Sequence, residues 1–205
     1  MDSYSTIATL GVYEYEDRKS VFIGMARPVS TEEEALGFLA AVKKKYPDAR
    51  HHVYAYALRD NATTRFSDDH EPQGTAGLPV LDAIRKRGLV DVVVVVTRYF
   101  GGTLLGTGGL VHAYTEAAAG ALTAGNIVTY DIYTTMAVVL SYSDYQRFLP
   151  LAQSGGFRID DTEYADSVRI TGRILETESD AFLCRLTDTF GGKEVATVIG
   201  EEYSC

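Results

Sequence analysis

The sequence predicts an α+β protein with two domains, and three patterns along the chain support this fold class. Alternating apolar segments near the N-terminus indicate a β-hairpin, and five consecutive valines at residues 92–96 indicate a buried strand. The last third of the chain follows the order βαββαβ. We expect a first domain at residues 1–131 and a second at residues 132–205, with a short linker at residues 130–133.

The N-terminal hairpin is predicted from residues 9–15 and 20–26, which are rich in Val, Ile, Tyr and Phe and flank a charged turn. A helix is expected next, over residues 31–46. Ser30 followed three residues later by a glutamate is a capping-box pattern, apolar residues then recur at helical spacing, and Pro47 stops the run.

The middle of the chain alternates strands and helices. Residues 53–58 are typical of a strand, and a short helix should end near Arg87. The valine run lacks the polar alternation of a half-exposed strand, so it predicts a central strand covered on both faces, with Arg98 at its C-terminal end. An alanine-rich helix is expected over residues 106–124, closed by glycine and asparagine.

The C-terminal third predicts a ferredoxin-like domain, in which two helices cover one face of an antiparallel sheet. Turn residues between the second and third strands support a central hairpin. Cys184 falls within a helical pattern, and we assign it to the helix core. The expected strands are residues 134–141, 156–164, 168–176 and 194–201, and the expected helices are residues 144–153 and 179–190.

The segment SDDHEPQGTAG at residues 67–77 is the first candidate site, because it places three carboxylates and a proline within five positions. These carboxylates could bind a metal, orient a hydroxyl or pair with Arg98. Ordinary turn chemistry is the alternative, since Ser and Asp side chains satisfy local backbone donors. The candidate binding residues are Ser67, Asp68, Asp69, Glu71, Pro72, Gly74, Thr75 and Gly77.

The segment TRYFGGTLLGTGGLVHAY at residues 97–114 is the second candidate site, because five glycines lie before and within the start of a predicted helix. Backbone amides there could hold an anion with Arg98 as the counter-charge. The glycines fit neither a P-loop nor a dinucleotide fingerprint, and close packing of a helix against a strand is the competing explanation. The candidate residues are Arg98, Tyr99, Gly101, Gly102, Gly106, Gly108 and Gly109.

Together these two segments resemble the paired motifs of the bacterial YigZ and eukaryotic IMPACT proteins, a family linked to translation. The resemblance implies an N-terminal domain with the left-handed βαβ fold of a small-subunit ribosomal protein and of elongation factor G domain IV. It also implies a C-terminal domain similar to domain V of that factor. His51 matches a histidine of the family, whereas His70 stands where glycine is common and His112 where a basic residue is common.

Composition limits the classes of function. The net charge is −9 and the pI is about 4.9. Residues up to Tyr133 carry a net charge of −3, and the residues after it carry −6. The acidic C-terminal part is therefore not expected to bind DNA or RNA nonspecifically. The chain lacks an apolar run long enough to span a bilayer, a signal-peptide pattern and metal-ligand spacing. Cys184 and Cys205 are not expected to form a disulfide. We therefore expect a cytoplasmic protein without cofactor, metal or membrane contact.

Three hypotheses for function follow, and we expect a binding protein rather than an enzyme. The resemblance implies a translation-linked regulator that binds the ribosome, RNA or a translation-associated protein. The alternative is an enzyme or sensor that binds an anionic, phosphorylated small molecule between the two motifs, with Asp69 or Glu71 as acid, base or metal ligand. A third possibility is an adaptor that acts only through its surface.

Overall fold

The computed structural model describes residues 3–205 and shows the predicted α+β class. The chain forms two compact units, Tyr4–Thr129 and Tyr130–Cys205, the second together with Ser3. We call them the N-terminal and C-terminal units. The division between the units falls at Thr129/Tyr130, at the break expected near residues 130–133, but these residues lie inside strand β7 (Ile127–Leu140) and form no irregular linker. Tyrosines and β-branched residues in this stretch favour an extended strand over an irregular linker.

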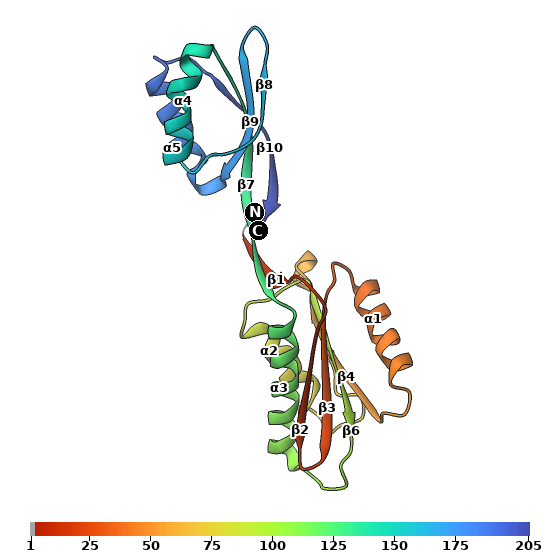
Figure 1. Ribbon diagram of the computed structural model, residues 1–205. Helices are drawn as coiled ribbons and strands as arrows, with labels where there is room; N and C mark the ends of the chain where they lie inside the picture. Colours follow the sequence, from red (N-terminus) through yellow and green to blue (C-terminus); the bar gives the residue numbers. More distant parts are fainter. Residues whose placement is uncertain (1–2) are drawn as a thin grey trace. The chain divides into compact units, whose positions relative to one another are not determined.

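The N-terminal unit is built on a five-stranded antiparallel sheet in the order β2-β3-β6-β4-β5 (Figure 1). The valine run lies in the central strand β6, and all five valines are fully buried, as the sequence predicts. The strands are β2 (Gly11–Asp17), β3 (Ser20–Pro28), β4 (His51–Ala57), β5 (Thr64–Ser67) and β6 (Val92–Tyr99).

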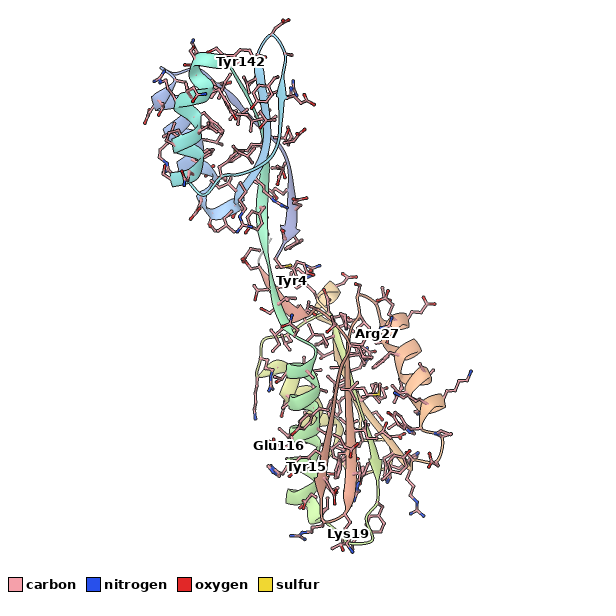
Figure 2. The ribbon with its side chains drawn as sticks, in the orientation of Figure 1. Tyr4, Tyr15, Lys19, Arg27, Glu116 and Tyr142 are labelled. Atoms are coloured by element: carbon pink, nitrogen blue, oxygen red, sulfur yellow. The ribbon has the colours of Figure 1, made fainter. Side chains whose placement is uncertain are left out.

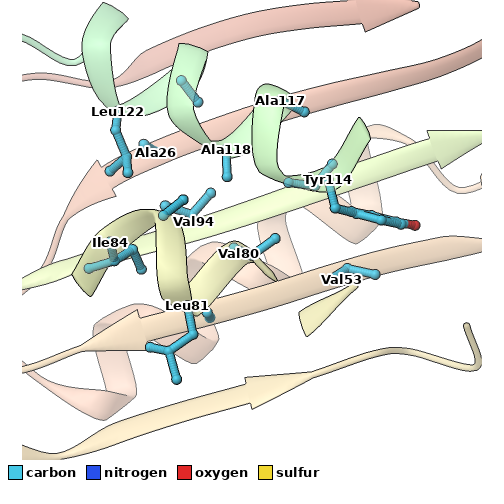
Figure 3. Packing of buried hydrophobic residues seen from close by; sticks show 14 of the residues in the cluster. Ala26, Val53, Val80, Leu81, Ile84, Val94, Tyr114, Ala117, Ala118 and Leu122 are labelled. Atoms are coloured by element: carbon cyan, nitrogen blue, oxygen red, sulfur yellow. The ribbon is translucent and has the colours of Figure 1, made fainter. Parts of the chain in front are cut away.

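Helices cover both faces of this sheet (Figure 1). Helix α1 (Glu32–Lys45) packs on the face that carries Val93 and Val95. Helices α2 (Gly77–Arg85) and α3 (Gly106–Ala124) pack on the opposite face, where small side chains allow a close approach. Figure 3 shows this second core, and its labelled residues are Ala26, Val53, Val80, Leu81, Ile84, Val94, Tyr114, Ala117, Ala118 and Leu122.

Several local details differ from the prediction. The N-cap of α1 is Thr31 rather than Ser30, because the Thr31 hydroxyl accepts a hydrogen bond from the Glu34 N–H. The Glu34 carboxylate in turn accepts a hydrogen bond from the Ser30 N–H. The capping pattern is therefore shifted by one residue. Strand β1 (Tyr4–Ile7) and a short 3-10 helix (Asp60–Ala62) are too short to have been recognised from periodicity.

The C-terminal unit follows the predicted order βαββαβ, and its strands form an antiparallel sheet in the order β10-β7-β9-β8. In chain order these strands are the fourth, first, third and second, as expected for a ferredoxin-like domain. Cys184 is exposed on α5, so its assignment to the helix core is wrong. The elements after β7 are α4 (Tyr142–Ser154), β8 (Arg158–Tyr164), β9 (Val168–Leu175), α5 (Glu176–Thr189) and β10 (Ala196–Ser204).

Candidate functional site

Both candidate segments lie at one end of the N-terminal sheet, which we call the motif end. It comprises the β2–β3 turn, residues 43–50, residues 67–76 and residues 98–114. Strand register brings these parts together, because Arg98 pairs with His51 on one side and with Phe22 on the other. The Tyr99 hydroxyl donates to Asp48 at 3.0 Å, and the Gly101 N–H donates to the Ser20 hydroxyl at 3.1 Å. Figure 2 labels Lys19, which lies in the β2–β3 turn.

Asp68 organises the first motif. One carboxylate oxygen accepts the Gly74 N–H at 2.9 Å, and the other accepts the N–H groups of Ala76 and Gly77 at 3.1 and 2.8 Å. Gly77 is the first residue of α2, so a carboxylate from the preceding loop satisfies backbone donors at the start of that helix. This is the turn chemistry that competes with a binding role for Asp68.

Asp69 joins the same loop to strand β4. Its carboxylate accepts the His52 N–H at 2.6 Å and lies 3.9 Å from the Lys43 ammonium. Its backbone carbonyl lies 2.8 Å from Nδ1 of His51. A carbonyl oxygen only accepts, so Nδ1 of His51 is the donor in this contact, and Nε2 lies 3.9 Å from Oε1 of Glu71.

Glu71 is the buried centre of the site, with only 4% of its side chain exposed. Its Oε1 accepts from Arg98 Nη1 at 2.6 Å and from the Tyr114 hydroxyl at 2.8 Å. Glu71 lies in the loop before α2, Arg98 at the end of β6 and Tyr114 on α3, so the network ties together three elements that are distant in sequence. Breaking such a buried pair by removing one partner is strongly destabilising.

The charges of Glu71 and Arg98 offset one another in this network, and the Tyr114 phenol stays neutral. Burial and the negative charge of Glu71 raise the pKa of Tyr114 far above its usual value, so the phenol stays protonated as a donor. The Arg98 guanidinium lies 5.4 and 5.7 Å from the rings of Phe22 and Phe100. Its Nε has no hydrogen-bond partner among residues 3–205. The charge of Arg98 is therefore balanced by Glu71, while one donor remains unused.

Backbone conformation explains other residues of the first motif. His70 adopts φ +70° and Gly74 adopts φ +76°, and only glycine reaches this region without a steric penalty. A glycine at position 70 would adopt this conformation without that penalty. The Thr75 hydroxyl donates to the carbonyl of Pro72 at 2.7 Å. A Cβ atom on Gly77 would lie 2.7 Å from the backbone of Ser67, so these two residues pack tightly.

The glycines of the second motif divide into two kinds. A Cβ atom on Gly101 would lie 2.1 Å from the backbone of Lys19, which is the close packing that competes with anion binding. Gly102 and Gly106 adopt φ +88° and +72° with open space around them. Gly108 also faces open space, and at Gly109 a Cβ would meet only the Leu105 Cβ, at 3.0 Å. The start of α3 is therefore accessible.

Three features of the motif end are not among the predicted site residues. Tyr114 lies within the second motif but was not singled out as a partner of Glu71. Phe100 and Leu104 are 50% and 82% exposed in the loop before α3, which is unusual for large apolar side chains. Cations from the β2–β3 turn, the end of α1 and the following loop are also exposed there, namely Arg18, Lys19, Lys43, Lys44, Lys45 and Arg50.

Residues 3–205 contain no group of three or more His, Cys, Asp or Glu side chains placed to hold a metal ion. None of the helices formed by these residues is long and apolar enough to cross a lipid bilayer.

The fold and the two motifs define a two-unit α+β protein of the class that the sequence resembles, and comparison with known proteins identifies its family. Residues 18–122 match the Impact N-terminal domain, and residues 138–193 match a domain of unknown function (DUF1949). The chain belongs to the IMPACT family.

Relatives and a solved structure agree with this assignment. The chain is 34% identical to the IMPACT family member YvyE of Bacillus subtilis (strain 168) over 194 residues, covering 94% of this chain and 89% of the relative. It is 47% identical to the IMPACT family member YigZ of Escherichia coli (strain K12) over 102 residues, covering 48% and 50%. A crystal structure of a hypothetical protein superposes with a TM-score of 0.61 at 31% identity, covering 98% of each chain.

Proposed function

We propose that this protein is a non-enzymatic, translation-linked binder whose motif end contacts ribosomal RNA. The observation that carries the proposal is the arrangement of charge at this end. Six Lys and Arg side chains are exposed there beside the exposed carboxylate of Asp48, while the three motif carboxylates Asp68, Asp69 and Glu71 are engaged by backbone N–H groups or by Arg98. Exposed cations contribute most of the sequence-independent affinity for a phosphate backbone.

The same geometry favours binding over catalysis. Glu71 and Arg98 neutralise one another in a buried pair, and Asp68 and Asp69 accept hydrogen bonds that hold the loop together. A general acid or base needs to reach a substrate proton directly or through one water. The accessible features are instead cations, the half-exposed Phe100 and the open backbone at Gly108, which suit phosphates and stacked bases.

Salt-titrated co-sedimentation with ribosomes tests this proposal. The variant K43A/K44A/K45A removes three exposed cations at the C-terminus of α1, at the motif end. The matched variant R85A/K86A/R87A removes three exposed cations at the C-terminal end of α2, before β6 begins at Val92, and so at the opposite end of the sheet. The first variant should lower the salt dependence of binding by about 2–3 in log–log slope, and the second should leave it near the wild type.

Two outcomes would overturn the proposal. One is that the wild-type protein does not co-sediment even at low salt. The other is that both triple variants weaken binding equally, because binding would then follow net charge rather than the motif end.

A second candidate function is the binding of an anionic, phosphorylated small molecule. Two observations favour it, namely the accessible backbone at Gly106 and Gly108 and the unused Nε donor of the buried Arg98. Balancing of the Arg98 charge by Glu71 weighs against it. A thermal-shift screen with nucleotides and sugar phosphates would reveal such a ligand, since a ligand at 100 times its Kd stabilises the protein by about 2.7 kcal/mol.

A further inference from the structure

Strand β10 (Ala196–Ser204) forms an open edge of the C-terminal sheet, since it pairs with β7 and with no other strand of the described chain. The Val139 N–H donates to the Val195 carbonyl at 2.8 Å. Bonding directions alternate along an antiparallel ladder, so the N–H and C=O groups of Ala196 and Val198 point away from β7. This edge therefore presents unpaired backbone groups to any strand that approaches it.

A groove lies beside this edge. It has a volume of about 220 Å³ and lies between α5 and the start of β10. Ala196 and Val198 are opposite Val138 and Met136, two residues of the buried core, so their side chains lie on the helix side of the sheet. A strand added to the edge would direct alternate side chains toward the groove, which is lined by Leu183, Leu186, Thr187, Glu194, Val195 and Ala196.

The length of the straight edge limits the size of the partner segment. The register of β10 shifts between Val198 and Gly200, and a bulge of this kind interrupts regular pairing. Val198 and Ile199 are 48% and 56% exposed at this point. The edge thus accommodates a short extended segment with at least one apolar side chain, rather than a long strand.

Charge selects the kind of segment. Among residues 183–202, the four carboxylates of Asp188, Glu194, Glu201 and Glu202 stand against the two cations Arg185 and Lys193. Arg185 lies 6.0 Å from the Phe182 ring, and Glu202 is shared with Arg173 at 3.1 Å. A second copy of the chain would bring like charges together. We propose that the β10 edge and its groove bind a short extended peptide segment of a partner protein in which Lys or Arg alternates with apolar residues, by strand addition.

Fluorescence anisotropy with the full chain tests this proposal. The probe is a labelled eight-residue peptide of alternating lysine and valine, and its matched control has glutamate in place of lysine. The lysine peptide should bind and the glutamate peptide should not. Val198→Pro removes one outward N–H, which proline on an edge strand tolerates, and should weaken binding about fivefold.

Two further variants separate charge from folding. Glu194→Gln removes a carboxylate of the groove and should weaken the lysine peptide about two- to fivefold. Glu163→Gln removes another exposed carboxylate from β8, at the other edge of the same sheet, and should leave binding unchanged. Thermal melting verifies that each variant is folded.

Three results would overturn the proposal. One is that the lysine and glutamate peptides bind equally, or that neither binds. Another is that Glu194→Gln and Glu163→Gln weaken binding of the lysine peptide equally. The third is a self-association of the wild type, seen in sedimentation velocity and lost in Val198→Pro, which would assign the edge to a second copy of the chain. None of these results bears on ribosome binding by the motif end.

Discussion

The two units differ in what they bury. The N-terminal unit buries the charged side chains of Glu71 and Arg98, together with His52. In the C-terminal unit, the buried polar residues among those described are Thr134 and Ser179, neither of which carries a charge. A buried ion pair contributes little net stability compared with apolar packing. In the unit that carries both motifs, this pair and Tyr114 hold the loop before α2, the end of β6 and α3 together.

The units also differ in the charge they present. Residues 1–133 carry a net charge of −3 and residues 134–205 one of −6, but exposed Lys and Arg side chains gather at the motif end of the N-terminal unit. If both proposals hold, one unit binds RNA and the other binds a basic segment of a protein. Such a pair of surfaces suits a ribonucleoprotein partner, because the ribosome offers both an anionic backbone and cationic chains.

The largest effect should come from breaking the buried charge network. Glu71→Ala leaves Arg98 buried without its partner and should lower the free energy of unfolding by about 3–5 kcal/mol, measured by urea denaturation. Thr134→Val is the matched change at a buried polar position of the C-terminal unit and should cost less than about 1.5 kcal/mol. Similar costs for the two variants would remove the difference between the units on which this comparison rests.

A smaller effect on stability should distinguish glycines that pack against neighbouring backbone from glycines that have open space around them. Gly101→Ala places a methyl group against the Lys19 backbone and should cost about 1–3 kcal/mol. Gly108 has open space around it and lies in the first turn of α3, so Gly108→Ala should raise stability by up to about 1 kcal/mol. Thermal denaturation gives both values. Ribosome co-sedimentation of Gly108→Ala then shows whether this glycine is kept for close approach of a ligand.

Much of the fold could be predicted from periodicity and end signals. Helix α3 has the predicted limits, Gly106–Ala124, because glycines mark both of its ends. The run Val92–Val96 lies in a central strand because no polar residue interrupts it. The order of elements in the C-terminal unit follows from turn residues between short apolar segments.

The site could be predicted only in outline, because side-chain direction depends on tertiary contacts. The motifs identify the residues around Glu71, but Asp68 and Glu71 are three positions apart and have opposite roles. One holds a turn through backbone N–H groups, and the other forms a buried ion pair. The periodicity of α5 likewise allowed Cys184 to be placed on the wrong face. Exposed features such as Leu104 are visible only once the loop is positioned.

The smallest predicted effect concerns the backbone of the first motif. His70 adopts φ +70°, where a Cβ atom is disfavoured by roughly 1–2 kcal/mol, so His70→Gly should raise the free energy of unfolding by about 0.5–1 kcal/mol after the entropy cost of glycine. His70→Ala keeps the Cβ atom and should not produce this gain. An equal gain in both variants, measured by urea denaturation, would attribute the effect to the imidazole rather than to the backbone. Because His70 is exposed, ribosome binding of the glycine variant reports separately whether the side chain contributes to the contact surface.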